Sequence, residues 1–297
     1  MQRNINGKDQ VIYQRILNNS NATIINSNKK YGDPWFYLSS LFSENINFLT
    51  VDLIGGLGNQ LFQLAFLLYC SKITGKPSFL MNLSSPRTQH SSQQYFETLL
   101  QKWKYLHCNK DVNTELKDNH RMEHEDWKSK INSTQGNIKL NGYFQRYQYV
   151  NEVREDFISR LTFNEAILEK YPDIQEKIVI HVRGGDYKNN NFHELNLTNY
   201  YKKCIELCKD EKFIVCTNDI PYAKQLVSIF DFIDENEVDT LYLISKAKGV
   251  ICANSSFSWW GAYLNPNRLI FMPSKWYNDS RMSNSGYYFK GCNIINI

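Results

Sequence analysis

The sequence predicts an α/β protein, because short apolar strands alternate with helical segments along most of its 297 residues. The alternation is tightest in the C-terminal half, where β-branched or apolar runs lead directly into turns. In this half we expect strands at 177–182, 213–217, 249–253 and 268–272, with helices at 198–209, 221–230, 239–247 and 257–264. Strands that are separated by helices form parallel sheets, so this half is predicted to be doubly wound.

The N-terminal half repeats the pattern with fewer elements. A strand at 48–54 ends in Gly55 and Gly56, and a helix then continues to about Thr74. Further strands are expected near 79–81 and at 138–140, on either side of a long polar stretch.

Residues 1–47 form a polar, Asn-rich extension. Its aromatic cluster at 35–42 is expected to pack on the body of the protein or on a partner subunit. The predicted division is therefore an extension at 1–47 and two α/β domains, at 48–160 and 161–297.

Composition argues against several classes of function. The formal net charge is only +4 and no block of like charges occurs, so no nucleic-acid partner is expected. No apolar run approaches the ~20 residues of a membrane span, and the first residues lack the apolar core of a signal peptide, so we expect no integral membrane segment and a cytoplasmic location. Seven cysteines without a Cys-x-x-Cys pair argue against a disulfide framework and a structural zinc site.

Three strand ends carry residues that suit an anionic ligand. Arg183 follows the strand at 177–182, and a guanidinium on a rigid strand end donates bidentately to phosphate. Ser255 and Ser256 lie in a strand-to-helix turn, where backbone N–H groups and the helix dipole favour an anion; the alternative is a helix cap followed by core tryptophans. Gly56 and Gly58 let the backbone approach a ligand or a facing domain closely.

Two short motifs resemble those of a dinucleotide-binding fold and of a metalloprotease, but the residues around them do not fit either class. Gly56-Leu57-Gly58 follows a strand, yet Leu61 replaces the third glycine of a dinucleotide fingerprint, so a nicotinamide enzyme is not expected. His120 to His124 spells a metalloprotease pattern, but its polar neighbours favour a solvated helix or loop. No Asp-x-Asp stands at a strand end, so no metal site is expected.

Five motifs occur in the order found in the α-1,2-fucosyltransferases, glycosyltransferase family 11, which the chain resembles over about residues 48–275. They are GGLGNQLFQLA (55–65), NGYFQRYQYV (141–150), HVRGGDY (181–187), CTNDI (216–220) and NSSFSWWGAYLN (254–265). The resemblance implies a GT-B-like fold, with two Rossmann-type halves facing across a cleft, the first on the acceptor side and the second binding the GDP-sugar. It also implies an inverting enzyme without a cofactor, which moves fucose from GDP-fucose to the 2-hydroxyl of a galactose-type acceptor. The absence of Asp-x-Asp implies that protein groups neutralise the leaving diphosphate.

The resemblance also implies residue roles. Arg183 occupies the place of the arginine held against the β-phosphate, and Asp239 stands sixteen positions before Ser255, where related enzymes carry the acidic residue that reads guanine. Asp219 is the other candidate for that contact, and Asp239 is alternatively a helix-start residue. The remaining expected substrate contacts are Gly56, Gly58, Asn59, His181, Asn254, Ser255 and Ser256. Asn59 is expected to contact the fucose hydroxyls, unless it caps the following helix.

The catalytic base has two candidates. Asp186 comes first because it follows Arg183 on the same loop, and Glu194 comes second. The alternative is a structural role, with Asp186 pairing with Arg183 and fixing its direction.

One position departs from the family pattern. The usual motif is His-x-Arg-Arg-Gly-Asp, and this chain has Gly184 in place of the second arginine. This departure motivates two alternatives, a nucleotide-sugar-binding protein without transferase activity and a transferase that uses another GDP-6-deoxyhexose. We expect Gly184→Arg to leave the fold intact unless Gly184 has a positive φ.

Overall fold

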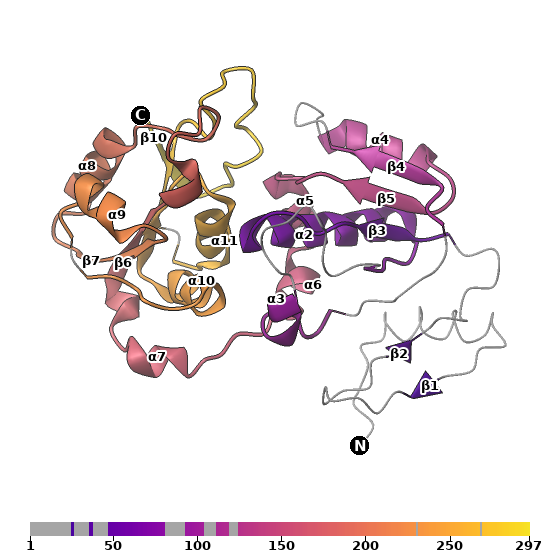
Figure 1. The fold of residues 1–297 in the computed structure, drawn as a ribbon, viewed down its shortest axis with the longest axis horizontal. Coiled ribbons are helices and arrows are strands. Elements are labelled where there is room, and N and C mark those ends of the chain that lie inside the picture. The colour runs from indigo at the N-terminus through magenta and orange to yellow at the C-terminus, as the bar shows by residue number, and fades with distance from the viewer. Residues whose placement is uncertain are drawn as a thin grey trace.

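The computed structural model describes 47–80, 94–103, 111–118, 126–229, 231–267 and 269–297 in full, and only the backbone of 25–26, 36–37, 93 and 124–125. It consists of two α/β halves side by side, with the N-terminal half at the right and the C-terminal half at the left of Figure 1. In the extension, β1 (Ile25–Asn26) and β2 (Phe36–Tyr37) form an antiparallel pair. The packing expected for the aromatic cluster at 35–42 otherwise lies outside the described residues.

The N-terminal half contains a parallel sheet in the order β3 (Leu49–Val51), β5 (Ile138–Asn141), β4 (Thr114–Lys117). Of the strand predicted near 79–81, the described residues 79–80 are not in a strand, and the chain makes an isolated parallel bridge just before them, between Ser78 and Leu49. Strand β4 was not predicted, since only Leu116 of its four side chains is buried and the segment reads as polar.

Helix α2 (Leu57–Thr74) follows β3 and is the central element of the molecule. It is buried along most of its length, as expected of a helix that packs on more than one side. Four shorter helices accompany it: α3 (Gln93–Glu97), α4 (His124–Ser133), α5 (Tyr147–Glu152) and α6 (Arg154–Ser159).

Helix α4 begins at the end of the metalloprotease-like motif, for which a solvated helix or loop stays a prediction. The motif lies outside the described residues except for the backbone of its last residue, which begins α4. The helix is seated on the core by Trp127 and Ile131, both fully buried, so it is not a purely solvated element. Within the described ranges, no three His, Cys, Asp or Glu side chains are grouped so that they could hold a metal ion.

The C-terminal half is doubly wound, as predicted. Its five parallel strands lie in the order β10 (Cys292–Ile295), β9 (Leu269–Pro273), β8 (Gly249–Ile251), β6 (Lys177–Val182), β7 (Lys212–Thr217). The helices are α7 (Ile167–Lys170), α8 (Thr198–Leu207), α9 (Ile220–Leu226), α10 (Glu237–Lys246) and α11 (Ser256–Leu264). Strand β10 is an addition at the sheet edge that the sequence did not reveal.

Both faces of this sheet are covered. In β6, Ile178, Ile180 and Val182 pack with the buried residues of α8, whereas Val179 belongs to a second core shared with α10 and α11. The chain passes from β6 out to β7 and returns to β8 on the other side of β6, so the strand order reverses between β6 and β8. In open α/β sheets, ligands bind at the carboxyl ends of the strands at such a reversal.

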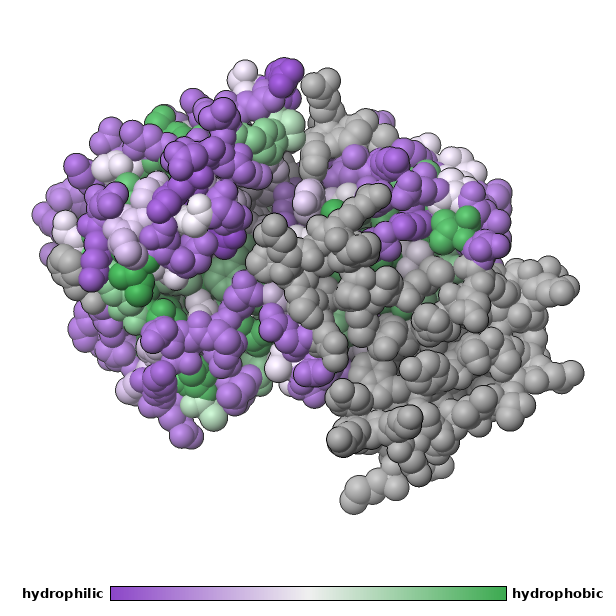
Figure 2. Space-filling view, in the orientation of Figure 1, coloured by the Kyte–Doolittle hydropathy of each residue, from purple (hydrophilic) through white to green (hydrophobic). Residues whose placement is uncertain are grey.

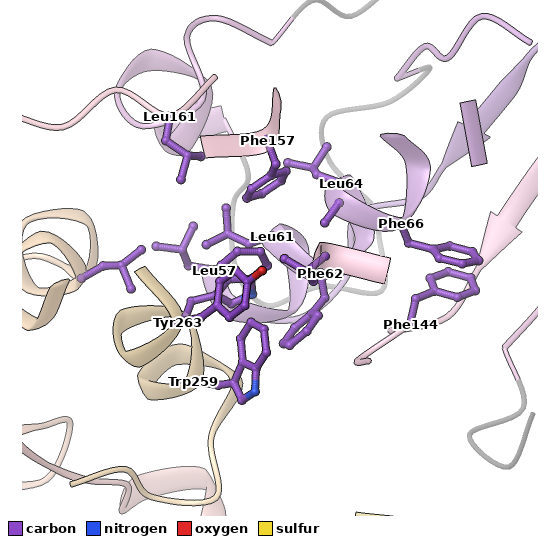
Figure 3. Close-up of a cluster of buried hydrophobic side chains, with 14 of the residues drawn as sticks. Leu57, Leu61, Phe62, Leu64, Phe66, Phe144, Phe157, Leu161, Trp259 and Tyr263 are labelled. Carbon is purple, nitrogen blue, oxygen red and sulfur yellow. The ribbon is translucent and has the colours of Figure 1, made fainter. Parts of the chain in front are cut away.

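The two halves meet where α2 crosses α11. The Phe62 ring lies 4.4 Å from Trp259, as Figure 3 shows, and 5.2 Å from Trp260 between centroids. The Phe157 ring lies 4.9 Å from that of Trp260 in a tilted arrangement. These rings belong to one apolar core that continues from the N-terminal sheet to the C-terminal one. The arrangement is the predicted GT-B-like one, while a domain boundary at 160 stays a prediction.

The surface is ordinary for an α/β protein on the face shown in Figure 2, where hydrophilic residues dominate the C-terminal half and hydrophobic ones form small patches. The large apolar side chains that are exposed among the described residues are Phe192, Leu207, Ile220 and Ile294. No helix within the described ranges has the length and apolarity needed to cross a membrane.

Candidate active site at the strand-order reversal

The predicted anion-binding segments lie next to each other. Strand β6 leads into Arg183 and β8 leads into Asn254-Ser255-Ser256, and the two strands are direct neighbours, with Ile180 opposite Ile251. Both segments therefore emerge at the carboxyl edge where the strand order reverses, so the fold places them where an α/β sheet binds its ligand.

Arg183 is held in a fixed direction. Its Nη2 lies 2.7 Å from Asp186 Oδ1, and its guanidinium carbon lies 5.3 Å from the centroid of the Tyr187 ring. The Nε of Arg183 is buried and has no hydrogen-bond partner among the described atoms. Since a buried guanidinium donor needs an acceptor, this side of Arg183 suits an anionic ligand. Asp186 therefore pairs with Arg183 and fixes its direction, as the structural alternative for Asp186 predicts. The role of Asp186 as a base stays a prediction.

The turn after β8 caps helix α11. Ser255 is the N-cap, and its Oγ accepts a hydrogen bond from Phe257 N at 3.4 Å. Trp259 and Trp260 are fully buried, so the alternative of a cap followed by core tryptophans is confirmed. The same geometry aims the first N–H groups and the positive end of α11 at the edge of the sheet, which is compatible with an anion there, and anion binding by this turn stays a prediction.

Helix α2 presents its N-terminus to the same region. Its N-cap is Gly56, which has no side chain to bond the first N–H groups of the helix. Trp260 Nε1 donates to Gly58 O at 2.9 Å. A Cβ on Gly58 would lie 2.5 Å from the backbone of Ser256 and Phe257, so this glycine permits the close approach of the facing domain. The positive ends of two helices thus converge beside Arg183, which favours an anion between them.

Asn59 connects the two helices. Its Oδ1 accepts hydrogen bonds from Ser256 Oγ at 2.6 Å and from Gln145 Nε2 at 2.7 Å. The alternative, a cap of α2 by Asn59, does not form, because the helix begins two residues earlier and Gly56 is its N-cap. Asn59 instead joins the predicted phosphate-binding turn to the N-terminal domain. The expected contact of Asn59 with the fucose hydroxyls stays a prediction.

His181 lies near the end of β6, two residues before Arg183. Its ring is buried and packs on Phe257 with centroids 5.6 Å apart, and its Nδ1 has no partner among the described residues. Burial, together with the charge of Arg183, lowers the pKa of His181 to about 3. The imidazole is therefore neutral and offers a buried polar nitrogen rather than a charge.

The two candidates for guanine recognition have different surroundings. Asp219 is the N-cap of α9, and its carboxylate accepts from Lys188 Nζ at 2.7 Å, from Tyr222 N at 3.1 Å and from Gly185 N at 3.3 Å. The bond from Lys188 is the main cause that lowers the pKa of Asp219. Asp219 therefore anchors the loop that carries Arg183.

Asp239 lies in the first turn of α10, where its Oδ2 accepts from Asn236 Nδ2 at 2.6 Å. Asp239 is thus a helix-start residue, which is the alternative to a guanine contact. Because α10 precedes the parallel strand β8, its N-terminus also lies at the carboxyl edge of the sheet, so a guanine contact stays a proposal.

The constraint on Gly184 is steric and does not come from a positive φ. Its φ is −114°, so the backbone does not demand glycine. A Cβ at this position would lie 2.6 Å from Asp219 Cβ and 3.0 Å from the Tyr222 ring, and Gly184 N donates to Asn218 Oδ1 at 2.9 Å. Gly184→Arg therefore requires the Asp219 side chain to move, and the expectation that the variant keeps its fold stays a prediction.

The remaining candidates support the loop around the site. Asn254 Nδ2 donates to the carbonyl oxygens of His193 and Trp276, both at 2.9 Å. Glu194 Oε2 accepts from Asn189 N at 3.0 Å. These contacts are structural, and those of Asn254 hold the segment after Arg183 against the segment after β9.

Sequence reasoning missed a set of residues that lie between the domains. Gln145 was quoted within a motif but received no role, and Tyr277 and Tyr287 lie in a segment without any recognisable pattern. Tyr287 OH donates to Gln145 Oε1 at 2.8 Å, and the Tyr277 hydroxyl bonds to that of Tyr287. These residues border a small surface depression, here called the interdomain depression, which is lined by Asp118, Gln145, Arg146, Tyr277, Ser283, Gly286 and Tyr287.

Comparisons with known proteins agree with this architecture. The model of the family described as "Glycosyl transferase family 11" matches residues 17–296. The O-antigen biosynthesis glycosyltransferase WbnK of Escherichia coli is 28% identical over 171 residues, 48% of this chain and 57% of that protein. An alpha-1,2-colitosyltransferase of Escherichia coli is 32% identical over 188 residues, 55% of this chain and 64% of that protein. The chain thus spans less than two thirds of the length of these relatives.

Among solved structures, the fucosyltransferase NodZ from Bradyrhizobium aligns with a TM-score of 0.51 at 12% identity, covering 75% of this chain and 95% of that one. This likeness concerns the fold and supports the GT-B-like assignment. The family match extends over nearly the whole chain and includes all five motifs. The protein therefore belongs to glycosyl transferase family 11.

Proposed function

We propose that this glycosyltransferase moves fucose from GDP-fucose to the 2-hydroxyl of a galactose-type acceptor, with inversion at the anomeric carbon and without a divalent cation. The observation that carries the proposal is the buried, unpartnered Nε of Arg183. Arg183 follows β6, and the neighbouring strand β8 leads into the N-cap of α11. This arrangement supplies positive charge at the strand-order reversal, where a nucleotide diphosphate is expected.

The chemistry requires that charge. Breaking the bond between the sugar C1 and the β-phosphate oxygen leaves negative charge on the phosphate and positive charge on the sugar. In the proposed mechanism Arg183, the Ser255 and Ser256 amides and the two helix dipoles stabilise the departing phosphate. The acceptor hydroxyl attacks the opposite face of C1, so a β-linked donor gives an α-linked product. Its proton passes to a base, for which Asp186 and Glu194 remain the candidates.

The other donor contacts are assigned by position. Asp239 reads the guanine edge from the N-terminus of α10, and His181, Gly56 and Asn254 border the nucleotide. Asn59 is close enough to the turn at Ser256 to contact a sugar hydroxyl there, since the two side chains are hydrogen bonded.

A second candidate keeps the reaction and changes the sugar. One relative is named an alpha-1,2-colitosyltransferase, and colitose differs from fucose by lacking the 3-hydroxyl. A site that hydrogen bonds the 3-hydroxyl would reject colitose strongly, whereas a site without such a partner would accept both sugars with a small preference. The ratio of kcat/KM for the two GDP-sugars therefore identifies the donor.

The test is a transfer assay with methyl β-galactoside, using GDP-fucose and GDP-colitose in parallel, with and without excess EDTA. We expect turnover that EDTA leaves unchanged and a product whose NMR spectrum shows an α-linked sugar on O2. Loss of turnover in EDTA with recovery in magnesium would refute the cation-free mechanism. A product linked elsewhere would refute the α-1,2 assignment.

A thermal-shift measurement, together with the transfer assay, distinguishes the transferase from the alternative that Gly184 motivates, a nucleotide-sugar-binding protein without transferase activity. GDP should raise the melting temperature more than ADP or UDP, because binding to the native state stabilises it. Stabilisation by GDP without transfer or hydrolysis of any GDP-sugar would favour a binding protein. Equal stabilisation by all three nucleotides would refute guanine recognition.

A further inference from the structure

We propose that His193 is the general base of the transfer reaction and takes the proton of the acceptor hydroxyl, in place of Asp186 or Glu194. The inference rests on the proposed transferase function and fills the one role in it that has two competing candidates. His193 has no role in the sequence patterns, because a single histidine in a polar loop belongs to no recognisable motif.

His193 lies in the loop after β6, next to the groups proposed to bind phosphate. Its carbonyl oxygen accepts from Asn254 Nδ2 at 2.9 Å, and its backbone N–H donates to Asn190 Oδ1 at 3.2 Å. Arg183, His193 and Asn254 line the same small hollow. The backbone of His193 is therefore fixed beside the turn after β8 by bonds that do not involve its imidazole.

The imidazole of His193 is held by aromatic rings. It stacks on Tyr187 with centroids 4.8 Å apart and an interplanar angle of 18°. The rings of Phe192 and Tyr277 lie 4.8 and 5.9 Å from it between centroids. The Tyr187 ring also contacts Arg183, whose guanidinium carbon lies 5.3 Å from its centroid. One ring thus contacts both the proposed phosphate cation and the proposed base.

The two carboxylate candidates already have structural tasks. In an inverting displacement the acceptor oxygen bonds to C1 on the face opposite the β-phosphate oxygen, which leaves with the electron pair of its bond. Asp186 Oδ1 lies 2.7 Å from Arg183 Nη2, which assigns it to the side of the leaving phosphate. Glu194 Oε2 accepts from Asn189 N at 3.0 Å, which commits it to holding the loop.

The imidazole keeps a ring nitrogen for proton transfer. Nδ1 of His193 is buried and has no hydrogen-bond partner among the described atoms. Buried polar nitrogens normally have a partner, and a neutral imidazole accepts at one nitrogen and donates at the other. A sugar hydroxyl that donates to His193 would supply such a contact. The same bond would carry the proton that must leave the hydroxyl as its oxygen bonds to C1.

The charges around His193 suit a base that is neutral at rest. Burial is the main cause that lowers the pKa of His193, while the carboxylate of Asp186 raises it and the charge of Arg183 lowers it. A diphosphate bound to Arg183 would offset that positive charge, so the imidazole would gain basicity when the donor is in place. The imidazolium formed in the reaction would be stabilised by Asp186 and by the departing phosphate.

The other titratable groups around the ring do not alter this sign. The formal charges of Lys188 and Glu194, which line the same hollow, cancel each other. Burial raises the pKa of the surrounding tyrosines, so these hydroxyls stay protonated at neutral pH; they are Tyr187, Tyr201, Tyr222 and Tyr277.

The first test keeps the packing of the ring and removes its nitrogens. His193→Phe leaves an aromatic side chain against Tyr187, so a residue that only packs should tolerate it. Phe192→Leu, which changes the adjacent ring and removes no nitrogen, is the matched control. We measure kcat and both KM values with GDP-fucose and methyl β-galactoside, and GDP affinity by calorimetry. We expect kcat to fall about 10²–10⁴-fold in His193→Phe, with the GDP affinity of the wild type, and Phe192→Leu to keep the wild-type kcat.

The second test follows the proton. In the wild type, kcat/KM should be constant at neutral pH and should be lost as the pH falls through the pKa of His193, because only the neutral imidazole accepts a proton. His193→Phe should lack this acid limb, whereas Glu194→Gln should retain it. Added imidazole should restore part of the rate of His193→Ala, since the free base can occupy the vacated space.

Each other outcome overturns the assignment. Wild-type kcat in His193→Phe would exclude His193 as the base and leave the proposed function standing. Loss of GDP affinity together with kcat would mean that His193 supports the donor site and moves no proton. An acid limb that persists in His193→Phe and disappears in Glu194→Gln would give the role to Glu194. A wild-type protein that binds GDP but transfers nothing would overturn both the base and the proposed function.

Discussion

Single residues at the site are held in place by partners on neighbouring segments. Arg183 is directed by Asp186, and the loop that carries it is anchored by Asp219 through Lys188 and the backbone. Such secondary contacts let a cation stabilise a leaving group without reorganising. They also explain why Gly184 is not an open position for a second arginine, since the anchor occupies the space of its Cβ.

His181 gives a pH-dependent prediction at this scale. Its pKa in the native state is about 3, whereas an unfolded histidine titrates near ~6.5. Between these values only the unfolded chain binds the proton, so the contribution of His181 is complete above pH ~6.5 and is lost as the pH falls toward 3. The loss amounts to about 1.4 kcal/mol per pH unit.

The measurement is the free energy of unfolding in urea at pH 7 and pH 5 for the wild type and His181→Gln. The wild type should lose about 2 kcal/mol more than the variant over this interval. Comparing the two slopes removes the cost of the altered side chain itself. Parallel pH dependences would show that His181 is not held neutral.

At the scale of elements, the site depends on the crossing of α2 and α11. Gly58→Ala tests this, because its Cβ would lie 2.5 Å from the backbone of α11. Such overpacking costs about 1–3 kcal/mol and would separate the two helix N-termini, so GDP binding should weaken together with stability.

The control is Gly75→Ala at the other end of the same helix. Gly75 has φ 68° with no atom within 4 Å of a Cβ, so the variant should lose about 1 kcal/mol through backbone strain alone. Unfolding free energies and GDP affinities are measured for both variants. Wild-type GDP affinity in Gly58→Ala would mean that the crossing does not form the site.

The elements that sequence could predict are those whose side chains are buried on a regular period. Strand β6 is buried along five of its six residues and was placed correctly, as were α8, α10 and α11 to within two residues. The short helix α7 was not predicted, and α9 ends at Leu226, earlier than predicted. Strands β4 and β10 escaped prediction because they lie at sheet edges and bury few side chains.

The same distinction applies to the site. Arg183 and the turn at Ser255 could be predicted, because each follows directly from a strand end in the sequence. The link from Ser256 through Asn59 to Gln145 could not, since it joins residues up to 197 positions apart. The collision between Gly184 and Asp219 likewise depends on the packing of two loops rather than on either motif.

At the scale of the whole molecule, the two halves share one apolar core rather than a polar interface. Relative motion is the usual expectation for two domains, but it requires a small or polar boundary. Here Phe62, Trp259 and Trp260 are fully buried at the crossing, and Trp260 donates across it. The two halves are therefore expected to hold donor and acceptor sites in a constant relation.

The central claim is that Arg183 holds the β-phosphate of a guanine nucleotide, and calorimetric titration of GDP and GMP into the wild type and Arg183→Ala tests it most directly. The wild type should bind GDP more tightly than GMP, since only GDP carries the β-phosphate. Arg183→Ala should lose about 1.5–3 kcal/mol of GDP binding, the scale of a hydrogen bond to a charged group, with GMP binding unchanged. An exposed arginine variant, Arg281→Ala, should behave as the wild type. If the preference for GDP over GMP persisted undiminished in Arg183→Ala, the assignment of Arg183 to the β-phosphate would be contradicted.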